Sequence, residues 1–183
     1  MIVKQTIIAV IAGTVLAISA GCSATRTRNS TGEVIDDAVI LGSVKSALIS
    51  DSGTDAHEIN VDVNRGVVQL NGFVDSQDQK SRATVVATGV KGVMQVQNNL
   101  AVSSGTESVG EHFDDSVLTA KVKAALIESP DTKAHQITVE TSGGVVQLSG
   151  FVNDEKAKLA ASTVAMSVKG VKSVSNEIAI KSY

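Results

Sequence analysis

A ten-residue segment, RGVVQLNGFV at residues 65–74, returns as GGVVQLSGFV at residues 143–152. The flanking residues align between the two copies without a gap, and roughly half of the paired positions are identical, which indicates a tandem duplication. Two repeats are too few for a solenoid, which needs at least about three. We therefore expect two domains of the same fold, at residues 36–102 and 114–181, joined by a Gly/Ser/Glu linker at residues 103–113.

Each copy begins with a helical pattern. Asp36 is expected to cap this helix in copy one, and apolar residues then recur at the spacing of one helix face. These apolar positions are Val39, Ile40, Val44, Ala47 and Leu48 in copy one and Val117, Leu118, Val122, Ala125 and Leu126 in copy two. The helix is expected to bury this face against the rest of its domain.

A β-hairpin pattern follows the helix. The segment INVDV alternates apolar and polar residues, as a half-buried strand does. Asn64, Arg65 and Gly66 supply a tight turn, because Gly and Asn tolerate positive φ. The repeated segment is then the second strand of the hairpin, and Gly72 is expected to bend the chain near its end.

A second helix and a last strand complete each copy. Ser76, with Gln79 three residues later, has the pattern of a capping box, and Asp154 is the expected cap in copy two. The helix is expected to end at Gly92, before the strand VMQVQNNLAV. The pattern predicts an α+β fold of two tandem αββαβ domains. Each is a three-stranded mixed sheet with two helices on one face and Asn, Gln, Ser and Glu side chains on the other.

The first residues have the pattern of a secretory signal peptide. Lys4 is followed by a short apolar run that ends in small residues directly before Cys22, the single cysteine of the chain. The sequence Ser-Ala-Gly-Cys at this point resembles a bacterial lipobox, so we expect residues 1–21 to be a lipoprotein signal peptide and Cys22 to be lipidated. The alternative is ordinary cleavage nearby, which would leave a soluble periplasmic protein with a free thiol.

The residues after Cys22 bear on location. Residues 22–35 are rich in Ser, Thr, Arg and Asn, which predicts a flexible tether between the lipid and the first domain. Ser23 rather than Asp follows the cysteine and favours delivery to the outer membrane. We therefore expect a periplasmic protein anchored by its N-terminal lipid, most consistently to the outer membrane.

No catalytic or metal-binding arrangement is visible in the sequence. His57 and His135 occupy matching positions before the first strand of each copy, without a second histidine in the same copy, and favour structural roles. Asn98 and Asn176 match within the last strand, where satisfying the backbone is the expected role. The net charge of -3 argues against a nucleic-acid binder. We expect no enzymatic activity, no cofactor, no metal and no small-molecule substrate.

The motifs of copy two resemble a known family. DDSVLTAKVKAAL, GGVVQLSGFV and VKGVKSVSNEIAI, slightly altered in copy one, closely resemble the BON domain (bacterial OsmY and nodulation). The resemblance implies the αββαβ fold and a non-enzymatic role in the cell envelope. Two-domain members include an outer-membrane lipoprotein that binds anionic phospholipid and an osmotically induced protein proposed to act as a chaperone.

Two functions follow from this resemblance. The first is binding to phospholipid membrane surfaces, in support of envelope integrity under osmotic or related stress. Copy two is the more basic copy, because its acids and bases balance whereas acids outnumber bases in copy one. If membrane binding carries over, the resemblance implies that Val117, Leu118, Lys121 and Lys123 make the contact. The alternative function is that of a periplasmic chaperone that binds unfolded envelope proteins.

Overall fold

The computed structural model describes residues 31–103 and 109–181. The expected signal peptide, the lipidation site Cys22 and most of the expected tether lie outside the described residues. The described elements form two domains with the same order of helices and strands, and each domain has its own hydrophobic core.

Domain 1 contains two helices and four short strands. They are α1 (Thr31–Ser50), β1 (Ile59–Asn64), β2 (Val67–Val74), α2 (Gln77–Thr88), β3 (Gln95–Asn98) and β4 (Ala101–Val102). Strand β2 is central: β1 pairs with it antiparallel, with Val61 opposite Leu70, and β3 and β4 both pair with it in parallel. The mixed sheet predicted from the sequence is therefore confirmed.

Domain 2 repeats this arrangement. Its elements are α3 (Val109–Glu128), a short 3-10 helix η1 (Ala134–Gln136), β5 (Ile137–Ser142), β6 (Val145–Val152), α4 (Glu155–Ser167), β7 (Ser173–Asn176) and β8 (Ala179–Ile180). Strand β6 takes the place of β2, pairing antiparallel with β5 and in parallel with β7 and β8.

The predicted last strand is divided in two in both domains. Between β3 and β4, the side-chain oxygen of Asn98 accepts a hydrogen bond from the backbone N–H of Leu100 at 3.1 Å, and its amide donates to the carbonyl of Lys80 at 2.7 Å. Asn176 makes the equivalent contacts with Ile178 and Lys158. The expected role of these asparagines, satisfying backbone groups at a strand irregularity, is confirmed.

The first helix of each domain begins earlier than the sequence suggested. Helix α1 starts at Thr31, so Asp36 lies inside the helix and the predicted cap at this residue is wrong. Val39 is also not part of the buried face, because its side chain is 60% exposed, whereas Ile40, Val44 and Leu48 are buried. The helix turns a narrower apolar face towards the core than expected.

The second helix begins where the sequence predicted but ends sooner. Ser76 and Gln79 form the expected capping box, and Asp154 caps α4 by accepting from the N–H of Ala157. Helix α2 ends at Thr88 rather than at Gly92, because a tight turn follows in which Gly92 has φ +95°. The left-handed glycine was expected at this position, but it lies in the turn after the helix.

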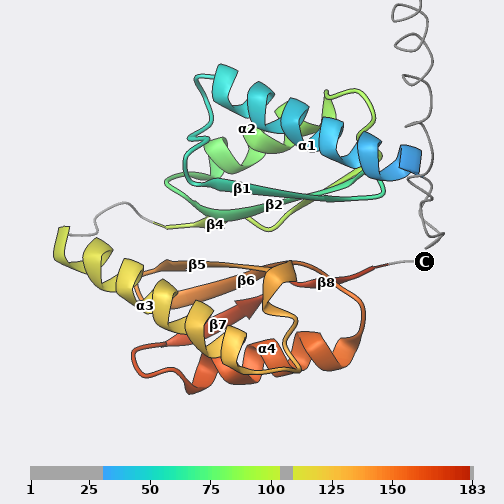
Figure 1. Ribbon diagram of the computed structural model, residues 1–183. Coiled ribbons are helices and arrows are strands. Elements are labelled where there is room, and N and C mark those ends of the chain that lie inside the picture. The colour runs from blue at the N-terminus through green and yellow to red at the C-terminus, as the bar shows by residue number, and fades with distance from the viewer. Residues whose placement is uncertain (1–30, 104–108, 182–183) are drawn as a thin grey trace, which may run out of the picture.

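The two sheets face each other across the middle of the molecule, and the helices lie on the two outer sides (Figure 1). Each sheet thus has its helices on one face and the other domain on the opposite face. The polar face predicted for each sheet is therefore covered: Gln69 and Asn71 of β2 and Gln147 and Ser149 of β6 are all buried.

Candidate functional site

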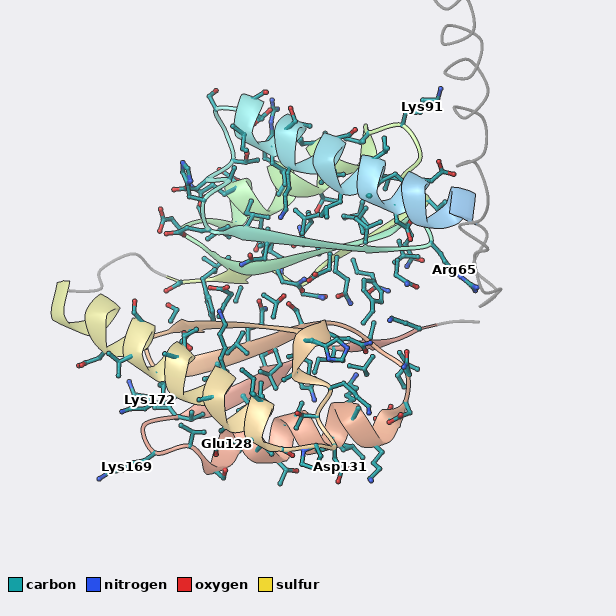
Figure 2. The ribbon with its side chains drawn as sticks, in the orientation of Figure 1. Arg65, Lys91, Glu128, Asp131, Lys169 and Lys172 are labelled. Atoms are coloured by element: carbon teal, nitrogen blue, oxygen red, sulfur yellow. The ribbon has the colours of Figure 1, made fainter. Side chains whose placement is uncertain are left out.

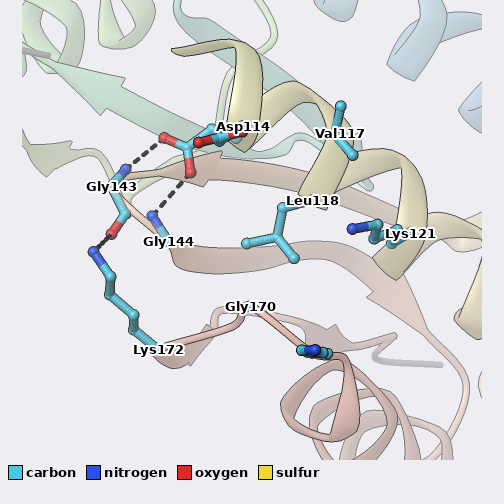
Figure 3. A pocket seen from close by; sticks show the side chains of 10 residues that line it. Asp114, Val117, Leu118, Lys121, Gly143, Gly144, Gly170 and Lys172 are labelled. Carbon is cyan, nitrogen blue, oxygen red and sulfur yellow. Dashed lines mark hydrogen bonds between the residues drawn. The ribbon is translucent and has the colours of Figure 1, made fainter. Parts of the chain in front are cut away.

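A pocket of about 350 Å³ lies at one end of domain 2, between the middle of α3, the β5–β6 turn and the loop after α4 (Figure 3). Its walls are Asp114, Asp115, Val117, Leu118 and Lys121 of α3, Gly143 and Gly144 of the turn, and Lys169, Gly170 and Lys172 of the loop. Leu118 belongs to the hydrophobic core, so the pocket has an apolar floor.

The β5–β6 turn is held against α3 by one carboxylate. Asp115 accepts hydrogen bonds from the backbone N–H of Gly143 at 2.6 Å and of Gly144 at 2.9 Å. Both glycines have positive φ, as the two central residues of a tight hairpin turn require. The aspartate was expected to favour the helix N-terminus, but its role is to fix this turn and thereby one wall of the pocket.

Three lysines surround the opening of the pocket. Lys121 and Lys169 are exposed and make no hydrogen bond or ion pair with any described residue. Lys172 donates from Nζ to the carbonyl of Gly143 at 2.7 Å, which keeps its charge beside the turn. Asp114 is exposed at the same opening, so the positive charges outnumber this exposed carboxylate. An anionic group with an apolar part fits this combination of charge and floor.

The corresponding place in domain 1 carries a different set of side chains. Ser43 stands where domain 2 has Lys121, and Met94, which is 82% exposed, stands where it has Lys172. Figure 2 shows that Lys91 and Arg65 of this region lie at the opposite end of the molecule from Lys169 and Lys172. The two domains therefore present different chemistry at their equivalent ends.

Three of the four membrane-contact residues expected from the sequence lie together at the pocket. Val117, Leu118 and Lys121 line it, although Leu118 is 7% exposed and reaches only the floor. Lys123 is exposed on the same helix but is not part of the pocket wall. The sequence analysis did not identify Lys169 and Lys172 as part of this site. The difference between Met94 in copy one and Lys172 at the equivalent position in copy two was a sign that the two copies differ here.

Catalytic, metal-binding and membrane-spanning features were also sought among the described residues. His57 and His135 are exposed, and no group of three or more His, Cys, Asp or Glu side chains in the described ranges is placed to hold a metal ion. Within the same ranges, no helix has the length and apolar character needed to cross a membrane.

The sequence comparison decides the family. The BON domain matches residues 36–104 and again residues 114–182. The chain belongs to the BON-domain family. Both BON domains therefore carry the family's fold, and the pocket lies at one end of the second BON domain.

Two relatives of known name have BON domains of similar sequence. Osmotically-inducible protein Y of Escherichia coli strain K12 is 38% identical over 164 residues, which are 89% of this chain and 82% of the relative. The outer membrane lipoprotein DolP of Haemophilus influenzae is 36% identical over 146 residues, 79% of this chain and 75% of the relative. These BON proteins support an envelope-associated, non-enzymatic role.

Among solved structures, CdsD of the type III secretion system of Chlamydia trachomatis covers 78% of this BON protein and 92% of its own chain. Its TM-score is 0.32 and its sequence identity is 12%, so this likeness carries no argument about function.

Proposed function

We propose that this protein is an envelope lipoprotein, anchored through Cys22, whose second BON domain binds the anionic surface of a phospholipid membrane. The observation that carries the proposal is the pocket in domain 2, where Lys121, Lys169 and Lys172 surround an apolar floor at Leu118. A lysine ammonium near an anionic membrane surface contributes about 1 kcal/mol, and this attraction is screened by salt. The name of the osmotically inducible relative supports a role under osmotic stress.

Vesicle flotation tests the proposal. A chain that begins at Ser23, without the anchor, should float with vesicles that contain phosphatidylglycerol and stay behind with vesicles of phosphatidylcholine alone. Replacing Lys121, Lys169 and Lys172 by alanine together should lower binding more than tenfold, because each lysine contributes roughly a factor of five. Added salt should lower the binding of the unsubstituted chain.

Lys91→Ala is the matched control for Lys169→Ala, since Lys91 occupies the equivalent loop of domain 1 and both substitutions remove one positive charge. It should bind the anionic vesicles as the unsubstituted chain does. The proposal fails if the triple variant still binds normally, or if the unsubstituted chain binds both kinds of vesicle equally.

A second candidate is a chaperone for unfolded envelope proteins. The observation in its favour is a set of large apolar side chains exposed on the outer surfaces of the helices, among them Ile49, Val85, Ile127 and Leu159. Suppression of the aggregation of an unfolded outer-membrane protein, unaffected by the three lysine substitutions, would favour this function over membrane binding.

A further inference from the structure

The side chain of Lys172 differs from the other two lysines at the pocket because it is held along its length. Its backbone N–H donates to the carbonyl of Gly144 at 2.9 Å, and its Nζ donates to the carbonyl of Gly143 at 2.7 Å. Between these ends the aliphatic stem lies over Gly144, where a Cβ would be 3.1 Å from Cγ, Cδ and Cε of the lysine. The β5–β6 turn therefore sets where the ammonium group of Lys172 lies.

The turn that holds Lys172 is itself held by Asp115. One carboxylate oxygen of Asp115 accepts from the N–H of Gly143 at 2.6 Å, and the other accepts from the N–H of Gly144 at 2.9 Å. Figure 3 shows the contacts that run from α3 through the turn to the lysine. Because Asp115 is only 6% exposed and both of its oxygens are bonded to the turn, we expect it to act on a ligand through Lys172.

A lysine ammonium group has three N–H donors, and the contact with Gly143 uses one of them. The other two remain for an anionic ligand at the pocket. We propose that Asp115 is a positioning residue for this ligand: it fixes the β5–β6 turn, and the turn directs the ammonium group of Lys172 towards the bound anionic group. This inference rests on the proposed function. It adds that Lys172 is an oriented contact, whereas Lys121 and Lys169 contribute through their charge.

Domain 1 has an equivalent turn and an equivalent carboxylate, but a different side chain over the turn. Asp37 accepts from the N–H groups of Arg65 and Gly66, and the N–H of Met94 donates to the carbonyl of Gly66 at 2.9 Å. The side chain of Met94 lies over this glycine, in the place that the lysine takes in domain 2. Equivalent substitutions at Asp37 and Asp115 therefore disturb equivalent turns, but Met94 has no charge to displace.

Charge and position predict opposite results for Asp115→Asn. The substitution removes a negative charge from the wall of a pocket with three lysines, so charge alone would strengthen binding to vesicles that contain phosphatidylglycerol. Asparagine has one acceptor oxygen in place of two, so the turn loses a contact and Lys172 loses its fixed support. In flotation of the chain that begins at Ser23, we expect binding about threefold weaker, a part of the roughly fivefold contribution of one lysine.

Two matched controls make the same change of charge. Asp114→Asn, at the neighbouring exposed residue, should leave binding unchanged or strengthen it. Asp37→Asn disturbs the turn of domain 1 and should leave vesicle binding unchanged, while urea denaturation shows a loss of stability similar to that of Asp115→Asn. In a chain that already carries Lys172→Met, the side chain found in domain 1, Asp115→Asn should weaken binding no further.

If Asp115→Asn has lost its folded circular dichroism spectrum, Lys172→Arg takes its place. Arginine keeps the charge but changes the geometry of the donors, so binding should fall about threefold, whereas Lys169→Arg should leave it unchanged. Equal binding of the Lys172→Arg variant and the unsubstituted chain would overturn the proposal.

Failure of the unsubstituted chain to bind the anionic vesicles would contradict the proposed function itself. The positioning role is overturned, with that function intact, if the unsubstituted chain binds and the folded Asp115→Asn variant binds as tightly or more tightly. It is equally overturned if Asp115→Asn weakens binding to the same extent in the chain that carries Lys172→Met.

Discussion

Asp37 and Asp115 have the same task in the two domains, which is to hold a hairpin turn against a helix. Asp37 accepts from the N–H groups of Arg65 and Gly66 at 2.7 and 2.9 Å, as Asp115 does from the turn of domain 2. Arg65 has φ +52°, an uncommon conformation for a residue other than glycine. The charged contact helps to compensate for the cost of this turn.

Removing the carboxylate of Asp115 should destabilise domain 2. Asp115 is buried and Asp115→Ala leaves two backbone N–H groups without their acceptor, so we expect a loss of about 2 kcal/mol in the free energy of unfolding. Urea denaturation measures this change. Asp114→Ala, next to it and exposed, should change stability by less than about 0.5 kcal/mol. Equal effects of the two substitutions would contradict the role assigned to Asp115.

Asp62 introduces a pH dependence at the domain interface. Burial raises the pKa of its carboxyl group, against the opposing effects of the Lys45 charge and of hydrogen bonds from Asn71 and Ser149, the latter from domain 2. Because the pKa is higher in the folded state, the folded protein takes up the proton more readily than the unfolded chain. The stability that this gives is present below the unfolded pKa and is lost as pH rises through the folded pKa.

Asp62→Asn should remove the fall in stability at higher pH, because asparagine carries no charge and keeps an oxygen that accepts a hydrogen bond from Asn71. We expect the variant to be more stable than the unsubstituted protein at pH 7, with a difference that shrinks as the pH is lowered towards 4. Thermal unfolding followed across this range measures the effect. A difference that grows on acidification would show that the carboxylate stabilises the interface instead.

At the scale of elements, two glycines of domain 1 have opposite requirements. Gly72 in β2 has positive φ and no room for a Cβ, whereas Gly42 in α1 is exposed and has open space, with no atom within 4 Å, where a methyl group would lie. Replacing each of these glycines by alanine therefore tests the local structure at both sites.

Gly72→Ala should destabilise the protein by more than about 3 kcal/mol, because both the backbone conformation and the carbonyl of Glu58 oppose the added methyl group. Gly42→Ala should instead stabilise it by up to about 1 kcal/mol, since alanine is the better helix former. Chemical denaturation of both variants gives the comparison. Similar stability of the two variants would mean that β2 does not hold Gly72 in the strained conformation.

The elements themselves were largely predictable from the sequence, for physical reasons that differ between them. The alternation in INVDV and the capping box at Ser76 are local signals, and both are confirmed. The start of α1 at Thr31 was missed because residues 22–35 were assigned to a flexible tether on their polar composition, although Ser30, with Glu33 three residues later, has the spacing of a capping box. The exposure of Val39 depends on the angle at which the helix meets the sheet, which the spacing of apolar residues does not define.

At the scale of the whole molecule, the sequence could not show that the two sheets meet. Gln69 and Gln147 looked like solvent-facing residues of a half-buried strand, and nothing local distinguishes them from the exposed Gln95. The pocket was only partly predictable for the same reason. Lys121 lies on the predicted helix, but Lys169 and Lys172 join it through a fold that brings together segments distant in sequence.

The buried glutamines also link the two copies, because the side-chain oxygen of Gln69 accepts from the N–H of Gly150 and that of Gln147 accepts from the N–H of Gly72. A substitution at Gln69 is felt at Gly150, and a substitution at Gln147 is felt at Gly72. A change at either glutamine therefore affects both copies, whereas the ends of the two copies differ, with Met94 in one copy and Lys172 in the other. The duplicated protein thus has two ends that differ and a middle in which a change at a glutamine of one copy alters a contact of the other copy.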